Sequence, residues 1–191
     1  MSSRERILSA VKKNQPELTE LVAYIQPESQ EDLLGRFTSV LEGIGGTAIV
    51  AQDLAGVKSY LKEMWQGKGR IVSMIPELQE LGELAGEADP HNFENVELAI
   101  IPAHFAVAEN SAVWVTEELL QQRVLPFITQ NLAVVVSKAR LVATMHHAYD
   151  IIGSGDYGFG TFIAGPSKTA DIEQSLVLGA HGSKSMTVFL I

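Results

Sequence analysis

The sequence contains no cysteine among its 191 residues. That absence excludes disulfide bonds, thiolate zinc sites and iron–sulfur clusters held by the chain itself. Apolar runs are short, and none reaches the roughly 18 consecutive residues of a membrane-spanning helix, so no span is expected. Residues 1–6 lack the apolar core of a signal peptide, and we therefore expect a cytoplasmic protein.

Positive charge is also scarce in this chain. Fourteen Lys and Arg residues face 23 Asp and Glu residues, which gives a net charge of −9. A general nucleic-acid binder neutralises phosphates with Lys and Arg, so this balance argues against that class. Hydrophobic residues make up 46% of the sequence, enough to build a core and to argue against disorder.

The hydrophobic pattern predicts strands that alternate with helices. A helix is expected over 30–44, where apolar residues recur at helical spacing, and Asp53 is expected to cap the next one. Further short helices are expected over 77–84 and 117–124, and another from Ser137 to about residue 151. The expected strands are 47–51, 70–74, 96–102, 132–137 and 186–191. This alternation predicts an α/β fold with a mostly parallel sheet and flanking helices.

Two segments depart from the alternation. Residues 105–108 and 112–116 are short strand-like runs separated by a polar turn, which predicts a hairpin. At the other end of the chain, Ser3 is expected to cap a first helix that stops before Pro16. We therefore predict an N-terminal helix and arm over 1–28 and an α/β domain over 29–191.

The stretch from Gly165 to Gly182 is the main candidate for a binding site. It follows a strand at 161–164, and we expect a turn and then a helix through Asp171 that closes at Gly179. Backbone N–H groups at such a turn favour anions, although Asp171 and Glu173 in the first helical turn would repel one. An ordinary connector remains the alternative. The candidate ligand-binding residues are Ser167, Lys168, Thr169, Asp171 and His181.

Two further residues are candidates for chemistry. Glu109 lies in the predicted hairpin turn, where a carboxylate can act as base or nucleophile, and a purely polar turn is the alternative. His104 follows the strand 96–102 and can point toward a cleft at the strand end. We expect Glu109, Thr169 and Asp171 to share one cleft at the carboxyl ends of the parallel strands.

No residue pattern predicts a metal or cofactor. His146 and His147 are adjacent, so a regular helix points them about 100° apart and they cannot bind one ion together. The glycine-rich segment 153–160 follows a helix and precedes a strand, whereas a dinucleotide fingerprint needs strand, loop and then helix. We therefore predict that the chain carries neither a metal nor a cofactor.

The residues quoted above also resemble a known family. Residues 165–173, 176–179 and 181–182, together with 3–8 and 105–109, are similar to the LUD domain and, more narrowly, to the lactate utilisation protein C family. The family often has Thr or Ser followed by Gly where this chain has Asn110-Ser111. It often has a histidine where Gln130 or Asn131 stands here.

The resemblance implies a NagB/RpiA/CoA-transferase-like fold. It also implies two partners that carry iron–sulfur clusters, in a set that oxidises L-lactate to pyruvate. One hypothesis is therefore an accessory subunit without a redox cofactor, working with cysteine-rich iron–sulfur proteins and a small organic acid. The alternative is a stand-alone enzyme or binding protein for a small carboxylate or CoA ester, with Glu109 as base or nucleophile. A homo-oligomer is left open.

Overall fold

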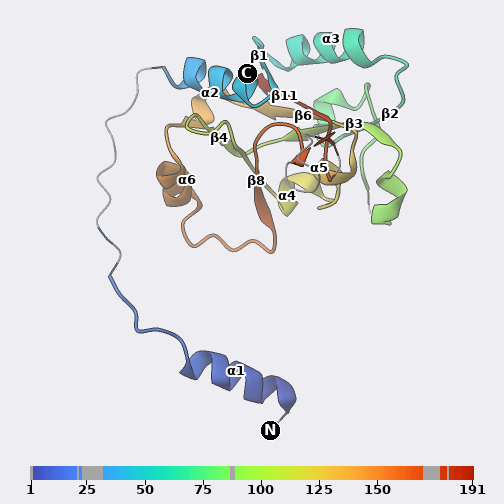
Figure 1. The fold of residues 1–191 in the computed structure, drawn as a ribbon. Helices are drawn as coiled ribbons and strands as arrows, with labels where there is room; N and C mark the ends of the chain where they lie inside the picture. Colours follow the sequence, from blue (N-terminus) through green and yellow to red (C-terminus); the bar gives the residue numbers. More distant parts are fainter. Residues whose placement is uncertain (1, 21, 23–31, 87–88, 170–176, 180) are drawn as a thin grey trace.

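Five parallel strands form the central sheet of this computed structural model, which describes residues 2–20, 22, 32–86, 89–169, 177–179 and 181–191. The strand order is β1 (Thr47–Val50), β11 (Ser185–Leu190), β6 (Asn131–Val136), β3 (Val96–Pro102) and β2 (Arg70–Ser73) (Figure 1). All four pairings are parallel, because helices or other connections return the chain between strands. The predicted α/β class with a mostly parallel sheet is therefore confirmed.

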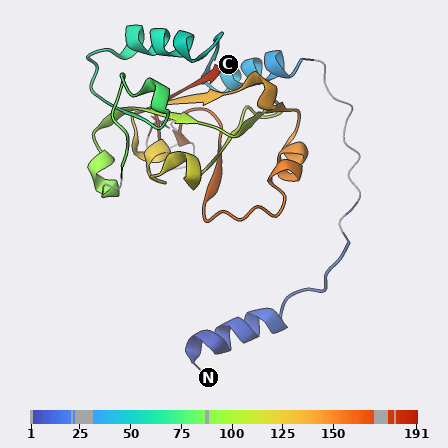
Figure 2. The same cartoon turned by 180° about the vertical axis from the view of Figure 1, so that it is seen from behind.

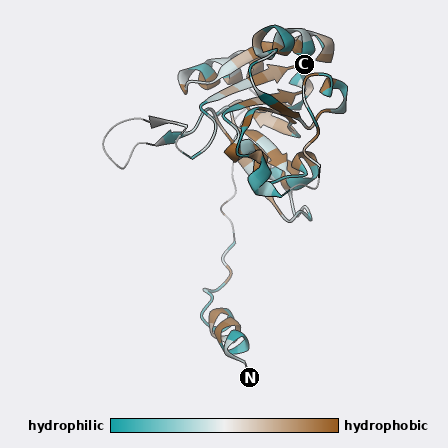
Figure 3. Cartoon of the chain, turned by 90° about the vertical axis from the view of Figure 1, so that its right-hand side faces the viewer, coloured by the Kyte–Doolittle hydropathy of each residue, from teal (hydrophilic) through white to brown (hydrophobic). Residues whose placement is uncertain are grey.

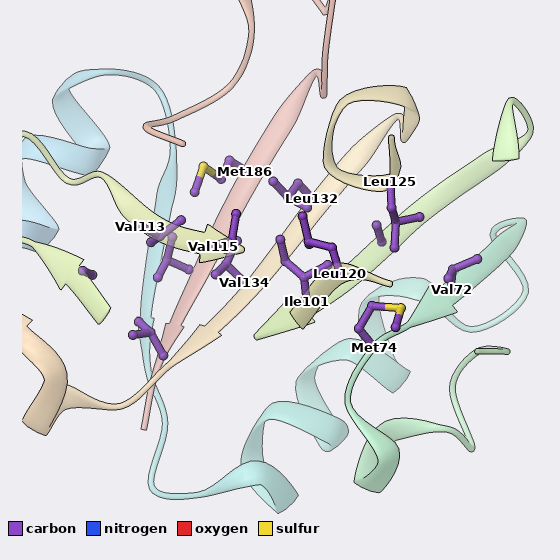
Figure 4. Close-up of a cluster of buried hydrophobic side chains, with 14 of the residues drawn as sticks. Val72, Met74, Ile101, Val113, Val115, Leu120, Leu125, Leu132, Val134 and Met186 are labelled. Carbon is purple, nitrogen blue, oxygen red and sulfur yellow. The ribbon is translucent and has the colours of Figure 1, made fainter. Parts of the chain in front are cut away.

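Each face of this sheet packs against its own layer. On one face, Val57 and Leu61 of α3 (Leu54–Trp65) pack with the strand residues Leu98, Ile100 and Phe189. The other face packs against α4 (Glu117–Leu120), α5 (Leu125–Ile128) and a second sheet, and α2 (Leu33–Gly43) completes this cluster (Figure 4). Strands buried on both faces explain the near-continuous apolar runs, which appear as brown ribbons inside the domain in Figure 3.

The second sheet has the order β7 (Leu141–Val142), β4 (Phe105–Val107), β5 (Val113–Thr116) and β8 (Gly160–Ile163). The predicted hairpin is confirmed as β4 and β5, with Phe105 opposite Trp114. β8 adds antiparallel to β5, and β7 adds parallel to β4. Helix α6 (Met145–Ile152) covers this sheet through the buried Ala148.

The N-terminal helix α1 spans Ser3–Lys13, and none of its residues is buried. Figure 1 and Figure 2 both draw it apart from the α/β domain. Ser2, rather than Ser3, is its cap, and the Ser2 hydroxyl and the Glu5 carboxylate form a reciprocal capping box. The boundary at 28/29 stays a prediction. No helix in the described part of the chain is long and apolar enough to cross a membrane.

The helix predicted to run from Ser137 to about residue 151 is wrong in its first half. Ser137 caps only a 3-10 turn, η3 (Lys138–Arg140), and the chain then extends as β7. Leu141 and Val142 pair with Ala106 and Val107, so hydrogen bonding to β4 overrides helix propensity here. The helix begins only at Met145, with the Thr144 side chain as its cap.

Two other predicted helices are shorter than expected. Residues 77–84 contain a single 3-10 turn, η1 (Pro76–Leu78), and another turn, η2, spans Pro90–Phe93. The segment 117–124 is helical only in α4, and α5 begins after a break at Gln121, whose φ is +52°.

The helix predicted after Gly165 is wrong at both of its ends. Lys168–Thr169 (β9) and Val177–Leu178 (β10) pair as an antiparallel two-stranded ribbon. The rest of the expected helix, including Asp171 and Glu173, lies outside the described residues. The final strand predicted at 186–191 is confirmed as β11.

Candidate functional site

A cleft with a volume of about 660 Å³ lies at the carboxyl ends of two central strands. Ala103 and His104 follow β3, and Ser137 and Arg140 follow β6, which is the neighbour of β3 in the sheet. The opposite wall comes from the second sheet, α4, the end of α6 and the loop after it. Open α/β sheets bind ligands outside the carboxyl ends of their strands, so this cleft is the candidate site.

His104 is the central polar side chain of the cleft, as its position after β3 predicts. Its backbone N–H donates to the carbonyl of Trp114, which fixes the chain direction at the end of the strand. Its Nε2 lies 2.8 Å from Oγ1 of Thr116, the last residue of β5. Burial lowers the pKa of His104, and nearby Arg140 lowers it further, whereas Glu118 raises it. The imidazole is therefore neutral at pH 7 and can accept a proton.

This shift makes His104 a contributor to acid sensitivity. Because the pKa is lower in the folded than in the unfolded protein, the unfolded state binds more protons as the pH falls below about 6.5. We therefore expect the free energy of unfolding to decrease as the pH is lowered through that window. The His104→Asn variant should lose less of its free energy of unfolding over the same pH change. Denaturant midpoints measured between pH 5 and pH 8 check this. Equal slopes for both proteins would contradict it.

Two charged side chains of the cleft differ in whether they already have a partner within the protein. Glu117 is engaged: it accepts from Nε of Arg123 at 2.8 Å and from the N–H groups of Gly158 and Phe159. The hydrogen bond from Arg123 is the main reason that its pKa is lowered. Arg140, in contrast, is exposed and forms no salt bridge with any residue that the structure describes. Its guanidinium is available to an anion.

Aromatic side chains form one wall of the cleft. Phe105 and Trp114 stack at a centroid distance of 6.4 Å, and Tyr157 meets Trp114 edge-on at 5.6 Å. Tyr157 belongs to the glycine-rich loop that follows α6. Glu117 holds the end of that loop through the backbone contacts described above, and Gly160 continues it into β8. Two glycines of this loop, Gly158 and Gly160, lie where a Cβ would collide with the cleft residues Glu117 and Trp114.

Glu109 lies away from these cleft residues, in the turn between β4 and β5. Its Oε2 accepts from the backbone N–H of Met145 at 2.8 Å, so the carboxylate caps the first turn of α6. Ser111, where the family often has glycine, takes a φ of +56° in the same turn. The predicted sharing of one cleft by Glu109, Thr169 and Asp171 stays open, because Asp171 lies outside the described residues. A catalytic role for Glu109 stays a prediction.

Substitution of Glu109 separates capping from catalysis. Glu109→Ala removes the acceptor and is expected to lower the free energy of unfolding by about 0.5–2 kcal/mol, whereas Glu109→Gln keeps an acceptor oxygen and loses less. Chemical denaturation of both variants measures this. A capping role leaves the function of Glu109→Gln intact in cells. Full loss of function in a stably folded Glu109→Gln variant would instead establish the carboxylate as base or nucleophile.

Two of the other predicted site residues do come together. Ser167 and His181 line a separate groove of about 210 Å³ beside Phe127 and Gly165. The backbone N–H of Ser167 donates to the Ser183 carbonyl at 2.9 Å, which joins the two ends of the predicted stretch. Lys168 is exposed on β9. Ligand binding by Ser167, Lys168, Thr169, Asp171 and His181 stays a prediction.

No metal centre is found among the described residues, where no three His, Asp or Glu side chains cluster in a way that could hold an ion. Nδ1 of His147 lies 2.7 Å from Oγ1 of Thr144, so this histidine is part of the α6 cap. We expect elemental analysis of the purified protein to find no stoichiometric iron or zinc, because the chain has no thiolate to offer. One equivalent of either metal would contradict this.

The matching family model is the LUD domain, which covers residues 80–191. The chain belongs to the LUD domain family. It is similar to Lactate utilization protein C of Bacillus subtilis (strain 168), with 26% identity across 85% of this chain and 71% of the relative. Lactate utilization protein C of Geobacillus kaustophilus (strain HTA426) is 25% identical across 83% of this chain and 68% of the relative. The resemblance read from the sequence is thus confirmed.

A third relative and a solved structure extend the comparison. Lactate utilization protein C of Bacillus pumilus (strain SAFR-032) is 29% identical over 116 residues, which are 54% of this chain and about half (48%) of the relative. A crystal structure of a DUF162 family protein from Deinococcus radiodurans superposes with a TM-score of 0.62. It covers 86% of this chain and 99% of its own at 14% identity, which supports the fold alone.

Proposed function

We propose that this protein is an accessory component of L-lactate utilisation that holds a small 2-hydroxy acid in the cleft and carries no redox cofactor. The names of the relatives support the pathway. The observation that carries the proposal is the combination, in one cleft, of the available guanidinium of Arg140 with the His104–Thr116 pair. A guanidinium is suited to a carboxylate, and an imidazole beside a hydroxyl is suited to a neighbouring hydroxyl group.

The roles proposed for this protein and for its partners follow from the protons and electrons that the oxidation releases. Conversion of a 2-hydroxy acid to a 2-oxo acid removes two electrons and two protons. His104, neutral at pH 7, can take the hydroxyl proton, and the proton of the C2–H bond is released to solvent as its electron pair leaves. The electrons require an acceptor, and a chain with no cysteine cannot ligate an iron–sulfur cluster through thiolates. We therefore propose that cysteine-rich iron–sulfur partners accept the electrons. Homo-oligomerisation of this chain stays a prediction.

A reconstituted assay tests the proposal. We expect lactate-dependent dye reduction to need both the iron–sulfur partners and this protein, and to be absent with this protein alone. The His104→Asn variant is expected to support a lower rate, and a Glu77→Gln variant, altered at a surface residue of η1, serves as the control. Turnover by the pure protein would overturn the accessory role. Full turnover by the partners without this protein would overturn its place in the reaction.

A further inference from the structure

We infer that the cleft is shaped for a 2-hydroxy acid that carries a planar aromatic ring, and that lactate itself leaves part of the cleft empty. The inference rests on the proposed function, because it places the carboxylate at Arg140 and the hydroxyl at the His104–Thr116 pair. It adds a separate subsite for the side chain of the acid. Three observations support that subsite: its aromatic wall, its packing and its charge.

The aromatic wall offers ring contacts that a methyl group cannot use. Phe105, Trp114 and Tyr157 all line the cleft, and their rings contact one another at the centroid distances given above. Tyr157 is 43% exposed, so part of its ring is open to a ligand. Aromatic rings favour offset or edge-to-face partners at 4.5–7 Å, and Tyr157 presents such a surface to an incoming ring. Trp114 and Phe105 are only 8% and 4% exposed and support Tyr157 from within the fold.

The wall is fixed before any ligand arrives. A Cβ at Gly160 would lie 2.5 Å from Cη2 of Trp114, so only glycine lets the indole occupy this place. A Cβ at Gly158 would lie 2.5 Å from Oε1 of Glu117, the oxygen that accepts from the N–H groups of the loop. Phe162 packs against Trp114 at a centroid distance of 4.6 Å. A pre-formed wall lowers the entropic cost of binding a ring.

The size and charge of the cleft narrow the ligand class. A volume of about 660 Å³ lies within the range of pockets that enclose drug-sized ligands, and a three-carbon acid occupies little of it. Among the described lining residues, Arg140 is the one Arg or Lys. The acidic lining residues are Glu117, which is paired with Arg123, and Glu118 and Asp156. A ligand with one carboxylate and an uncharged ring fits this set. A phosphorylated ligand would bring negative charge toward Glu118 and Asp156.

Binding of L-lactate and L-3-phenyllactate to the full chain tests the inference, because the two acids differ only by the ring. We expect calorimetry to show phenyllactate binding at least about tenfold more tightly. The chain has two tryptophans, so in a Trp65→Phe background the fluorescence of Trp114 reports on this wall. Phenyllactate is expected to change that fluorescence more strongly than lactate does.

Tyr157→Ala is the discriminating variant. It should weaken phenyllactate binding several-fold more than lactate binding, and so remove most of the preference. Tyr149→Ala is the matched control, because Tyr149 is a 62% exposed tyrosine on α6 that contacts Phe162 but does not line the cleft. It should retain the preference. Equal affinities for both acids would overturn the ring subsite and leave the proposed function standing. Binding of neither acid would overturn the assignment of the cleft itself.

Discussion

Replacement of Gly165 by valine is expected to lower the free energy of unfolding by about 2–6 kcal/mol. Gly165 has a φ of +70°, a region that a β-branched residue enters only at a cost of about 1–3 kcal/mol. The new Cβ would also lie 2.8 Å from Cδ1 and 3.0 Å from Cγ1 of Ile44, which closes α2. Overpacking of this kind adds about 1–3 kcal/mol. Chemical denaturation of the purified variant measures the sum.

Gly67→Val is the matched control for this substitution. Gly67 has a similar φ of +78°, but a Cβ there meets no atom within 4 Å. It should therefore show the backbone cost of about 1–3 kcal/mol without the clash. A loss at Gly165 that exceeds the loss at Gly67 measures the contact with Ile44. A wild-type midpoint for Gly165→Val would show that the turn has an ordinary backbone conformation.

The sequence predicts the central sheet well because its strands are local features with strong signals. Strands β3, β6 and β11 are mostly buried on both faces and are predominantly apolar, with Glu97 and Thr187 as the polar residues inside β3 and β11. Helix α2 is recognised from apolar residues at helical spacing, and α3 from the Asp53 cap, whose carboxylate accepts from the Gly56 N–H. These elements need no tertiary information to be recognised.

Two of the mispredicted segments become strands by pairing with strands elsewhere in the chain. Leu141 and Val142 are strand residues only because β4 lies beside them. Val177 and Leu178 likewise depend on pairing with Thr169 and Lys168. Local propensity does not register these pairings, so it favours a helix at residues that the structure shows as strands.

In the candidate site, too, some residues are predictable from the local sequence and others depend on tertiary packing. His104 is found from the sequence because it directly follows a strand predicted with a strong signal. Arg140 follows β6 at the end of η3, and the sequence misses it because residues 138–140 are predicted as the first turn of a helix rather than as part of the strand-end site. Thr116 and Tyr157 belong to other elements, and only the packing of the second sheet brings them to the cleft. Counting charged residues just after each predicted strand would have found Arg140.

Replacement of Arg140 by glutamine is expected to weaken binding of 2-hydroxy acids by about 10- to 100-fold. Loss of a charge-assisted hydrogen bond to a carboxylate removes about 1.5–3 kcal/mol of binding free energy. The same change should alter the free energy of unfolding by less than about 0.5 kcal/mol, because the guanidinium is exposed and has no salt bridge within the described chain. Calorimetry and denaturant unfolding on one preparation measure both quantities.

Two comparisons make this prediction specific. Arg140→Lys keeps the charge but not the planar fork of donors, so its affinity should fall between those of the wild type and Arg140→Gln. In the free protein, Arg140 is one of the causes that lower the pKa of His104. Removal of its charge should therefore move that pKa upward, toward the ordinary value for histidine, in an NMR titration of the ring. A raised pKa with unchanged affinity would place Arg140 beside His104 but outside the binding site, whereas a raised pKa with weakened binding assigns the carboxylate to its guanidinium.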